Sequence, residues 1–508
     1  MNRKLRRWHL REQRRIQRRL EKAEGGQEPK NTGPEMSGNG VVYDVSDKCR
    51  AVPYGGLGVM HKLARSVGLV DAIDRGLYIL MFYKPYRESD HILNIVFNLL
   101  CGGRVLDDIE IRRNDAAFLD MLGARAIPDP TTAGDFCRRF REEHVWTLMN
   151  VVNEVRVGVW NRIEGFYDQT ARIDADGTLV STHGECKGGM DVSYKGTWGY
   201  HPLVVSLANT NEPLFIVNRS GNVVSHDGCV PVLDQAVQLC KSAGFKDVLL
   251  RGDTDFSLTP QFDRWTEQGV RFVFGYDARR PMVERADDIP DGEYTELVRK
   301  AEQAFAGKPR RKQPRTKLEA IRRRGFRNLT LESEELAEFD HKPGRAKGTY
   351  RIVVLRKTIL EEKGQQCIGH VHRYFFYVTN DRGMTKAQVV RESNDRCRQE
   401  NLIEQLKNGV RALHAPLNTL VANWAYMVIA SLAWSLKAWF ALLVPISPRW
   451  RESHLAQRQR LLTMDFPTFV QLLMLIPAQI VHTARRIVVR LLAWRSEANV
   501  LFRLLDAL

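Results

Sequence analysis

The sequence predicts an α/β fold: a mixed sheet with a β-rich insertion, flanked by helical N- and C-terminal regions. Three observations lead to this prediction. Apolar residues recur at helical spacing from about residue 56 to 165, for example at Ile92, Ile95, Val96, Leu99 and Leu100. From about residue 170, alternating apolar residues predict three strands, then a helix, then further strands. A polar and basic stretch then leads to a strongly hydrophobic strand at 374–379.

The elements follow in order along the chain. We expect strands at 171–182, 201–208 and 213–218, a helix at 230–243, and strands at 247–251, 269–276, 350–358 and 374–379. One long polar helix is expected at 384–412, with helical spacing continuing to the C-terminus.

The chain has 508 residues, enough for about three domains. Changes of pattern suggest six regions. They are a basic arm and linker (1–50), a helical domain (51–165), a sheet domain in two parts (166–280 and 371–445), a basic β-containing insertion between those parts (281–370), and a C-terminal helical region (446–508).

Two short segments hold the excess positive charge of this chain, whose net charge is +16. Residues 1–30 contain 11 Lys/Arg against 4 Asp/Glu, and residues 299–327 contain 12 against 2. The rest of the chain is therefore close to neutral. A neutral body with basic attachments is typical of a protein that binds a polyanion, and nucleic acid is the leading partner, ahead of solubility tails or a membrane surface.

The eight cysteines show no CxxC pair, which favours a reducing, cytoplasmic location over a disulfide-bonded secreted protein. The N-terminal stretch also lacks the apolar core of a secretory signal. Cys367, His370 and His372 have the character of zinc ligands, but a fourth ligand is missing. The apolar segment 420–445 raises the alternative of a membrane span. Asn423, Ser431, Ser435 and Lys437 interrupt it, so a buried core helix is the better interpretation.

Acidic residues occur at three places where chemistry could use them. Asp174 and Asp176 fall on one face of the first predicted strand, because side chains alternate along a strand. Two acids in an apolar strand are costly unless they bind a cation or face an open cleft. Asp253 ends the apolar run 248–252, and α/β sheets place their sites at the carboxyl ends of strands.

The third place is the long polar helix. At 100° per residue, Arg396, Glu400 and Lys407 share one stripe within about 40° of each other. Glu404 is rotated by about 40° from Glu400 and is a rival to it. A solvated, salt-bridged helix face would show the same pattern.

Asp, Asp and Glu gathered by a mixed sheet are hard oxygen ligands that suit Mg²⁺, with Mn²⁺ as a substitute. Two such ions can activate a nucleophile on one side of a phosphodiester and stabilise the leaving oxygen on the other. Basic segments supply contacts to a DNA backbone. The acids and the charge together therefore indicate phosphoryl transfer in DNA.

At these residues the chain resembles the DDE transposases of bacterial insertion sequences, a group that includes the insertion sequence 4 and insertion sequence 1380 families. The resemblance covers roughly residues 170–440. It rests on Asp174-Ala-Asp176-Gly-Thr178, on His183-Gly-Glu185, on Gly199-Tyr-His-Pro-Leu203 and on Leu250-Arg-Gly-Asp253-Thr-Asp-Phe256. Val273-Phe-Gly-Tyr276 follows as in the family.

The family's last motif is Tyr-(2)-Arg-(3)-Glu-(6)-Lys. Arg396, Glu400 and Lys407 fit its spacing, which selects Glu400 over Glu404, whereas Ser393 stands at the Tyr position. For the first acid the resemblance favours Asp176 over Asp174, with Asp174 kept as a possible metal ligand.

The resemblance implies an RNase H-like fold in which Asp176, Asp253 and Glu400 meet around Mg²⁺. It also implies that the helical domain recognises inverted terminal repeats, that Arg396 and Lys407 contact DNA, and that two copies act together on the paired ends. We expect further DNA contacts from the basic insertion at Arg310, Arg311, Arg322, Arg323 and Arg324. Phe305, Phe326 and Tyr350 are candidates to stack on a flipped base, although core packing suits any one of them.

Two other functions compete with this one. Another RNase H-like nuclease would cleave without joining, and a protein descended from an inactivated element would bind DNA without cleaving it. Inverted repeats flanking the gene would favour the transposase.

Overall fold

The computed structural model describes residues 49–82, 85–182, 184, 186–299, 323–363, 366–484, 486–492 and 498–508, together with residues 11, 14, 15, 18 and 43. The predicted basic arm therefore lies almost wholly outside the described residues.

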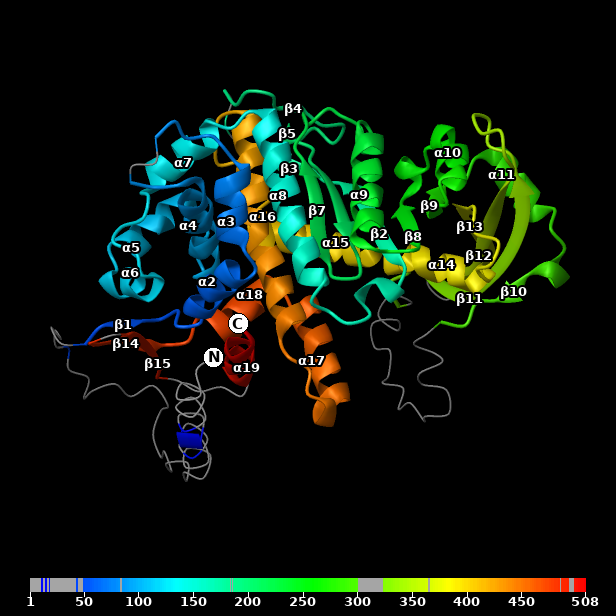
Figure 1. Cartoon of the computed structure of the whole chain (residues 1–508). Helices are drawn as coiled ribbons and strands as arrows, with labels where there is room; N and C mark the ends of the chain where they lie inside the picture. Colours follow the sequence, from blue (N-terminus) through cyan, green and yellow to red (C-terminus); the bar gives the residue numbers. More distant parts are fainter. Residues whose placement is uncertain are drawn as a thin grey trace.

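Helices dominate the N-terminal part, as their apolar spacing predicts (Figure 1). A two-residue strand, β1 (Ala51–Val52), comes first. It is followed by α2 (Leu57–Ser66), α3 (Leu69–Gly76), α4 (Glu88–Leu100), α5 (Ile109–Arg113), α6 (Ala116–Leu122), α7 (Pro130–Arg138) and α8 (Glu142–Trp160). Asp115 and Asp129 begin two of these helices by accepting hydrogen bonds from backbone N–H groups of the first turn.

A nine-stranded mixed sheet forms the centre of the protein, in the order β10-β11-β12-β13-β9-β8-β2-β6-β7. Its first part consists of β2 (Ala171–Gly177), β6 (Leu203–Leu207), β7 (Glu212–Val217), β8 (Val248–Gly252) and β9 (Arg271–Tyr276). Strands β2, β8 and β9 run parallel, whereas β6 is antiparallel to both β2 and β7. The parallel strands bring their carboxyl ends to one edge of the sheet.

The strands of the predicted insertion extend this same sheet. They are β10 (Thr295–Glu296), β11 (Arg327–His341), β12 (Tyr350–Lys363) and β13 (Gln366–Thr379). The hydrophobic segment 374–379, predicted as a separate strand, is the last part of β13. It pairs with β9 on one side and β12 on the other, which explains its apolar character.

Helices pack on the sheet at several points. Helix α9 (Cys229–Ala243) packs on β2, β6, β7 and β8. Helix α10 (Phe262–Glu267) precedes β9 and α11 (Arg280–Asp287) follows it. Helix α14 (Lys386–Asp395) packs across β8, β9, β11, β12 and β13, and α15 (Cys397–Glu404) packs against β2.

Helix α16 (Leu420–Leu443) is, within the described residues, the one helix long and apolar enough to cross a membrane. It packs against α4, α8 and β7, and 94% of its most apolar window is buried. Its buried Lys437 donates from Nζ to the Leu462 carbonyl at 3.0 Å and lies over the Trp434 ring. Helix α16 is therefore a buried core helix, as the sequence predicts.

The C-terminal region is not wholly helical, contrary to the prediction. After α17 (Arg451–Thr463) and α18 (Phe466–Phe469), the chain forms a hairpin of β14 (Ala478–Thr483) and β15 (Arg486–Leu491) before α19 (Ala498–Ala507). Strand β14 also pairs with β1, so the two ends of the described chain share a small sheet. The β-branched residues of 480–489 favour strands over helix.

Candidate active site

Two of the predicted acids lie at the same edge of the sheet. In the parallel pair β2–β8, Asp174 is aligned with Arg251. Two residues further along each strand are Asp176, near the end of β2, and Asp253, directly after β8. The Asp253 carboxylate begins a short 3-10 turn by accepting the Asp255 N–H at 3.0 Å, which holds it at the strand end.

The pKa values of these acids report on their surroundings. The pKa of Asp176 is raised to about 6, chiefly by burial: the positive charge of Arg396 opposes the rise, and the negative charges of Asp253 and Glu400 add to it. Burial also raises the pKa of Asp253, with a smaller contribution from Asp255. The three predicted acids are therefore electrostatic neighbours, and a cation between them would relieve their repulsion.

The Glu400 segment differs from the single long helix that the sequence predicts. It is divided into α14, α15 and a π-helical turn at Gln405–Gly409, with a junction at Arg396. Arg396 Nη1 lies 3.5 Å from Asp176 Oδ2. The Arg396 guanidinium thus links the helix junction to the first acid.

Lys407 and Glu404 lie further along the same segment. Burial lowers the pKa of Lys407, and the negative charges of Glu404 and Asp176 oppose this change. The exposed Glu404 accepts a hydrogen bond from Asn408 at 2.6 Å. Arg396 and Glu400 change the pKa of Asp176, and Asp176 and Glu404 change that of Lys407, although the breaks at Arg396 and in the π-helical turn mean that these side chains do not lie on one continuous helix.

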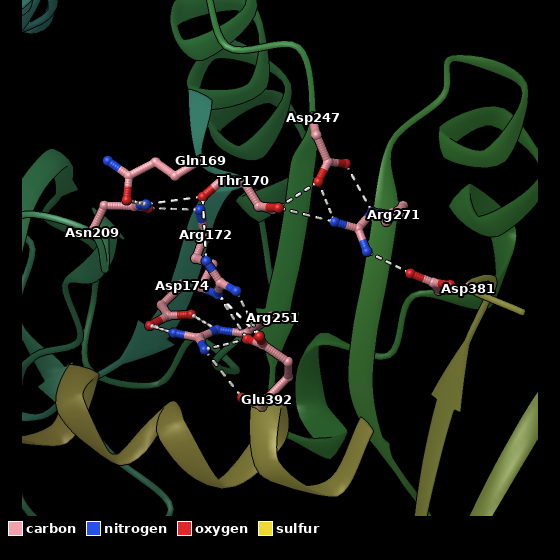
Figure 2. Close-up of polar contacts among 10 residues, drawn as sticks. All are labelled: Gln169, Thr170, Arg172, Asp174, Asn209, Asp247, Arg251, Arg271, Asp381 and Glu392. Atoms are coloured by element: carbon pink, nitrogen blue, oxygen red, sulfur yellow. Dashed lines mark hydrogen bonds and ion pairs between the residues drawn. The ribbon is translucent and has the colours of Figure 1, made fainter. Parts of the chain in front are cut away.

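Asp174 occupies a different environment (Figure 2). Only 1% of it is exposed, and both carboxylate oxygens accept hydrogen bonds from Arg251, at 2.7 and 2.8 Å. Arg251 also pairs with Glu392 at 3.0 Å, and Glu392 in turn pairs with Arg172 at 2.8 Å. These ion pairs fasten α14 to β2 and β8, and they leave Asp174 inside the sheet.

Sequence reasoning did not find the residues that hold the helix in place. Besides Glu392, the buried Gln399 donates from Nε2 to the Val204 carbonyl at 3.0 Å and accepts from the Ser206 hydroxyl through Oε1. Gln399 precedes Glu400, so its bonds to β6 position the third acid. A buried amide on an otherwise polar helix has no distinct sequence pattern.

No three His, Cys, Asp or Glu side chains enclose a metal site in the described part of the chain. The predicted carboxylates are neighbours at one edge but do not form a closed coordination shell. Their chemistry nevertheless suits a hard divalent cation, since all are oxygen donors and two have raised pKa values. The sequence also offered Cys367, His370 and His372 as zinc ligands. His370 Nε2 lies 2.7 Å from a Glu332 carboxylate oxygen, and the Cys367 side chain lies outside the described residues.

The DNA-contact residues predicted in the insertion divide into two groups. Arg323 and Arg324 are exposed, whereas Arg310, Arg311 and Arg322 lie outside the described residues. Among the aromatic candidates, Phe326 is 56% exposed and Phe305 lies outside the described residues. Tyr350 is buried against Phe262 and Phe272, which makes it a core residue instead of a base-stacking one.

Similarity to known proteins identifies the family of this chain. No curated protein matches the sequence significantly. One similar solved structure is the cryo-EM structure of a piggyBac transposase synaptic complex with hairpin DNA. It is 11% identical, the match covers 84% of this chain and 83% of that one, and the TM-score is 0.35, a likeness too remote to assign fold or residues. The family model described as transposase DDE domain group 1 matches residues 49–508. Because that match spans almost all of the sequence, the chain belongs to the transposase DDE domain group 1 family.

Proposed function

We propose that this protein is a DNA transposase that binds the inverted terminal repeats of an insertion sequence, cleaves at its ends and joins the freed 3′-hydroxyls to target DNA. One observation carries the proposal. Asp176 and Asp253 lie side by side at the carboxyl ends of two adjacent parallel strands, β2 and β8. The negative charge of Glu400, on α15, contributes to the raised pKa of Asp176. Membership of a transposase family makes DNA the substrate that this edge would act on.

The sheet supports an RNase H-like core. Counted along the chain, the first five strands of the sheet have the spatial order 3-2-1-4-5, with the second strand antiparallel to its neighbours. In this arrangement the first and fourth strands are adjacent and parallel, which places an acid from each at the same edge. The narrower likeness to the insertion sequence 4 and insertion sequence 1380 families stays a prediction.

Asp176, Asp253 and Glu400 are the residues that would hold Mg²⁺, or Mn²⁺ in its place. When bound, such ions activate the attacking oxygen of a water or a 3′-hydroxyl and stabilise the leaving oxygen. The chain's own contribution is to hold three carboxylates close together in spite of their repulsion. Arg396 limits that repulsion by pairing with Asp176, and it is placed to contact DNA when a cation takes over this role.

We assign Asp174 a structural role. Both of its oxygens accept hydrogen bonds from Arg251 inside the sheet, so a cation at Asp174 would have to be buried beside a guanidinium of the same charge. The pair links β2 to β8, the strands that lead to Asp176 and Asp253, and Arg251 also joins them to α14 through Glu392, just before the α15 helix that carries Glu400. Asp174 therefore supports the site indirectly.

DNA binding is proposed for the basic insertion and for the N-terminal helices, the latter reading the terminal repeats. We also propose that two copies assemble on the paired ends in the cytoplasm. The family match supports DNA as the substrate of this protein.

The test uses the DNA that flanks the gene as substrate. Purified protein is incubated with this DNA and Mg²⁺, and breaks and joined products are mapped. Breaks confined to the element ends, followed by joining and lost in Asp253→Asn, would establish transposition. Scattered nicking without joining would favour a nuclease, and binding without cleavage would favour an inactive DNA-binding protein.

Glu400→Gln and Glu404→Gln form a matched pair for the third acid, because they lie one helical turn apart on the same segment. We expect cleavage to be lost in Glu400→Gln and retained in Glu404→Gln. The reverse result would move the third acid to Glu404.

A further inference from the structure

A group of cationic side chains surrounds the segment that follows α15. Lys407 lies in the π-helical turn Gln405–Gly409, and its pKa is lowered by burial and, to a smaller extent, by the positive charge of Lys195. The half-buried His414 receives or donates a hydrogen bond at 3.0 Å between its Nε2 and the Lys407 carbonyl oxygen. We call Arg104, Lys195, Lys407 and Arg411 the cationic cluster, and His414 lies beside it.

Burial lowers the pKa of His414, and the positive charges of Arg411, Arg104 and Lys407 lower it further. These groups come from segments far apart in the sequence. Arg104 belongs to the loop after α4, and Lys195 to the turn between β4 (Asp191–Val192) and β5 (Trp198–Tyr200). The fold therefore gathers four positive charges, with Glu404 and Asp176 as the acids that act on Lys407, and a bound anion would reduce the remaining repulsion.

Arg411 shows a second unusual feature. Its backbone has φ of 60°, one of two positive φ values at non-glycine residues in the described chain. The neighbours explain why this conformation is imposed. Val410 N–H is bonded to the Gln405 carbonyl and Leu413 N–H to the Leu406 carbonyl, while Ala412 and Leu413 are buried. Strained backbone held by its surroundings is typical of functional sites.

The Arg411 side chain is also incompletely satisfied. Its Nε is buried and has no hydrogen-bond partner among the residues that the structure describes. A buried guanidinium nitrogen without an acceptor is costly, because it has lost water without gaining a partner. An oxygen acceptor from outside the chain would satisfy it.

We infer that the cationic cluster is a binding site for the phosphodiester backbone of DNA, next to the catalytic edge and reaching the loop after α4 through Arg104. This inference rests on the proposed function, since Lys407 connects the cluster to Asp176. Phosphate oxygens suit the site because arginine donors and lysine charges recognise them, and because a strand that passes the acids would continue across it. The cluster would hold the strand where it passes from the scissile bond toward the loop after α4.

The experiment measures DNA binding without metal, so that it does not depend on cleavage. A fluorescein-labelled duplex from the flank of the gene is titrated with full-length protein over a range of salt concentrations. Arg104→Ala removes an exposed cation, and Arg411→Gly removes a guanidinium while accepting the positive φ. Each variant should weaken binding and make the salt slope of log K shallower by about one.

Two controls separate the cluster from general effects. Arg451→Ala removes an exposed arginine at the start of α17, which projects from the body of the protein (Figure 1). It should leave the salt slope unchanged. Arg411→Lys keeps the charge and should restore most of the affinity lost in Arg411→Gly, which a purely structural role would not produce.

Slopes that stay the same in Arg104→Ala and Arg411→Gly, or fall equally in Arg451→Ala, would overturn the inference. In those cases the wild-type protein still binds DNA, and the proposed function is unaffected. A wild-type protein that fails to bind the duplex at all would instead contradict the proposed function. Unfolding temperatures of the variants identify any loss of binding that comes from misfolding.

Discussion

Arg251 and Asp174 form a bidentate ion pair inside the sheet, with nitrogen–oxygen distances of 2.7 and 2.8 Å, and each residue is no more than 2% exposed. The two residues are aligned in the parallel pair β2–β8. Two positions further along the same strands, Asp176 and Asp253 reach the edge of the sheet. Register alone thus separates the buried, ion-paired Asp174 from Asp176, the acid that we propose to be catalytic, although both lie on one face of β2.

Asp174→Ala should destabilise the protein by about 3 kcal/mol, the lower end for breaking a buried ion pair. The reason is that Arg251 would keep a buried charge, although Glu392 would still compensate part of it. Urea unfolding monitored by circular dichroism measures the change. A variant at position 174 that is as stable as wild type but cannot cleave would show that Asp174 acts in catalysis.

Asp176→Asn should have the opposite effect on stability. The pKa of Asp176 in the folded protein is about 6, above the ordinary value of 3.8, so the folded state keeps a proton that the unfolded chain has released. Stability therefore falls as pH rises from 3.8 to about 6, and the loss persists at higher pH. Removing the carboxylate should raise stability at neutral pH, by at most about 3 kcal/mol, and should have little effect below pH 3.8.

Thermal unfolding on both sides of pH 6 tests this expectation. Mg²⁺ adds a second measurement, because a cation bound near Asp176 should stabilise the wild-type protein at neutral pH and leave Asp176→Asn unchanged. Equal stabilisation of both proteins by Mg²⁺ would place the cation elsewhere.

Gln399→Leu should reduce both stability and cleavage. The substitution removes a buried amide that bonds to the Val204 carbonyl and the Ser206 hydroxyl, and leaving these groups unsatisfied costs about 1–3 kcal/mol. Glu400 would then be held less firmly at the edge. Arg398→Ala, at the exposed position on the other side of Gln399, is the control and should preserve stability and cleavage.

Replacing Arg322, Arg323 and Arg324 with Ala should weaken DNA affinity and flatten its salt dependence, because the slope falls by about one for each phosphate that the protein no longer neutralises. The corresponding triple Lys variant retains the charge and should behave like wild type. Binding isotherms over a range of salt concentrations measure the slope. An unchanged slope in the Ala variant would exclude this stretch from the DNA-binding surface.

The sequence predicted much of the framework because local patterns report on burial. Helical spacing identified the N-terminal helices, alternation located the strand of Asp176, and a short apolar run located the strand that precedes Asp253. Polar residues within the apolar segment 420–445 identified α16 as a buried helix instead of a membrane span. Local patterns failed where partners are distant. The strands β11 to β13 extend the central sheet through the β13–β9 pair, and the C-terminal hairpin pairs with β1.

The candidate site shows the same division. The sequence by itself placed Asp176 in a strand, Asp253 directly after one and Glu400 on a helix, since these depend on local periodicity. The structure ends the strand of Asp176 at Gly177 instead of residue 182, which puts this acid at the sheet edge. The tertiary structure decided the roles, because burial and ion pairing depend on neighbours that the chain brings from far away. Asp174 is neutralised by Arg251, 77 residues later in the chain, whereas Asp176 meets Arg396 at the surface of the sheet edge, 220 residues later.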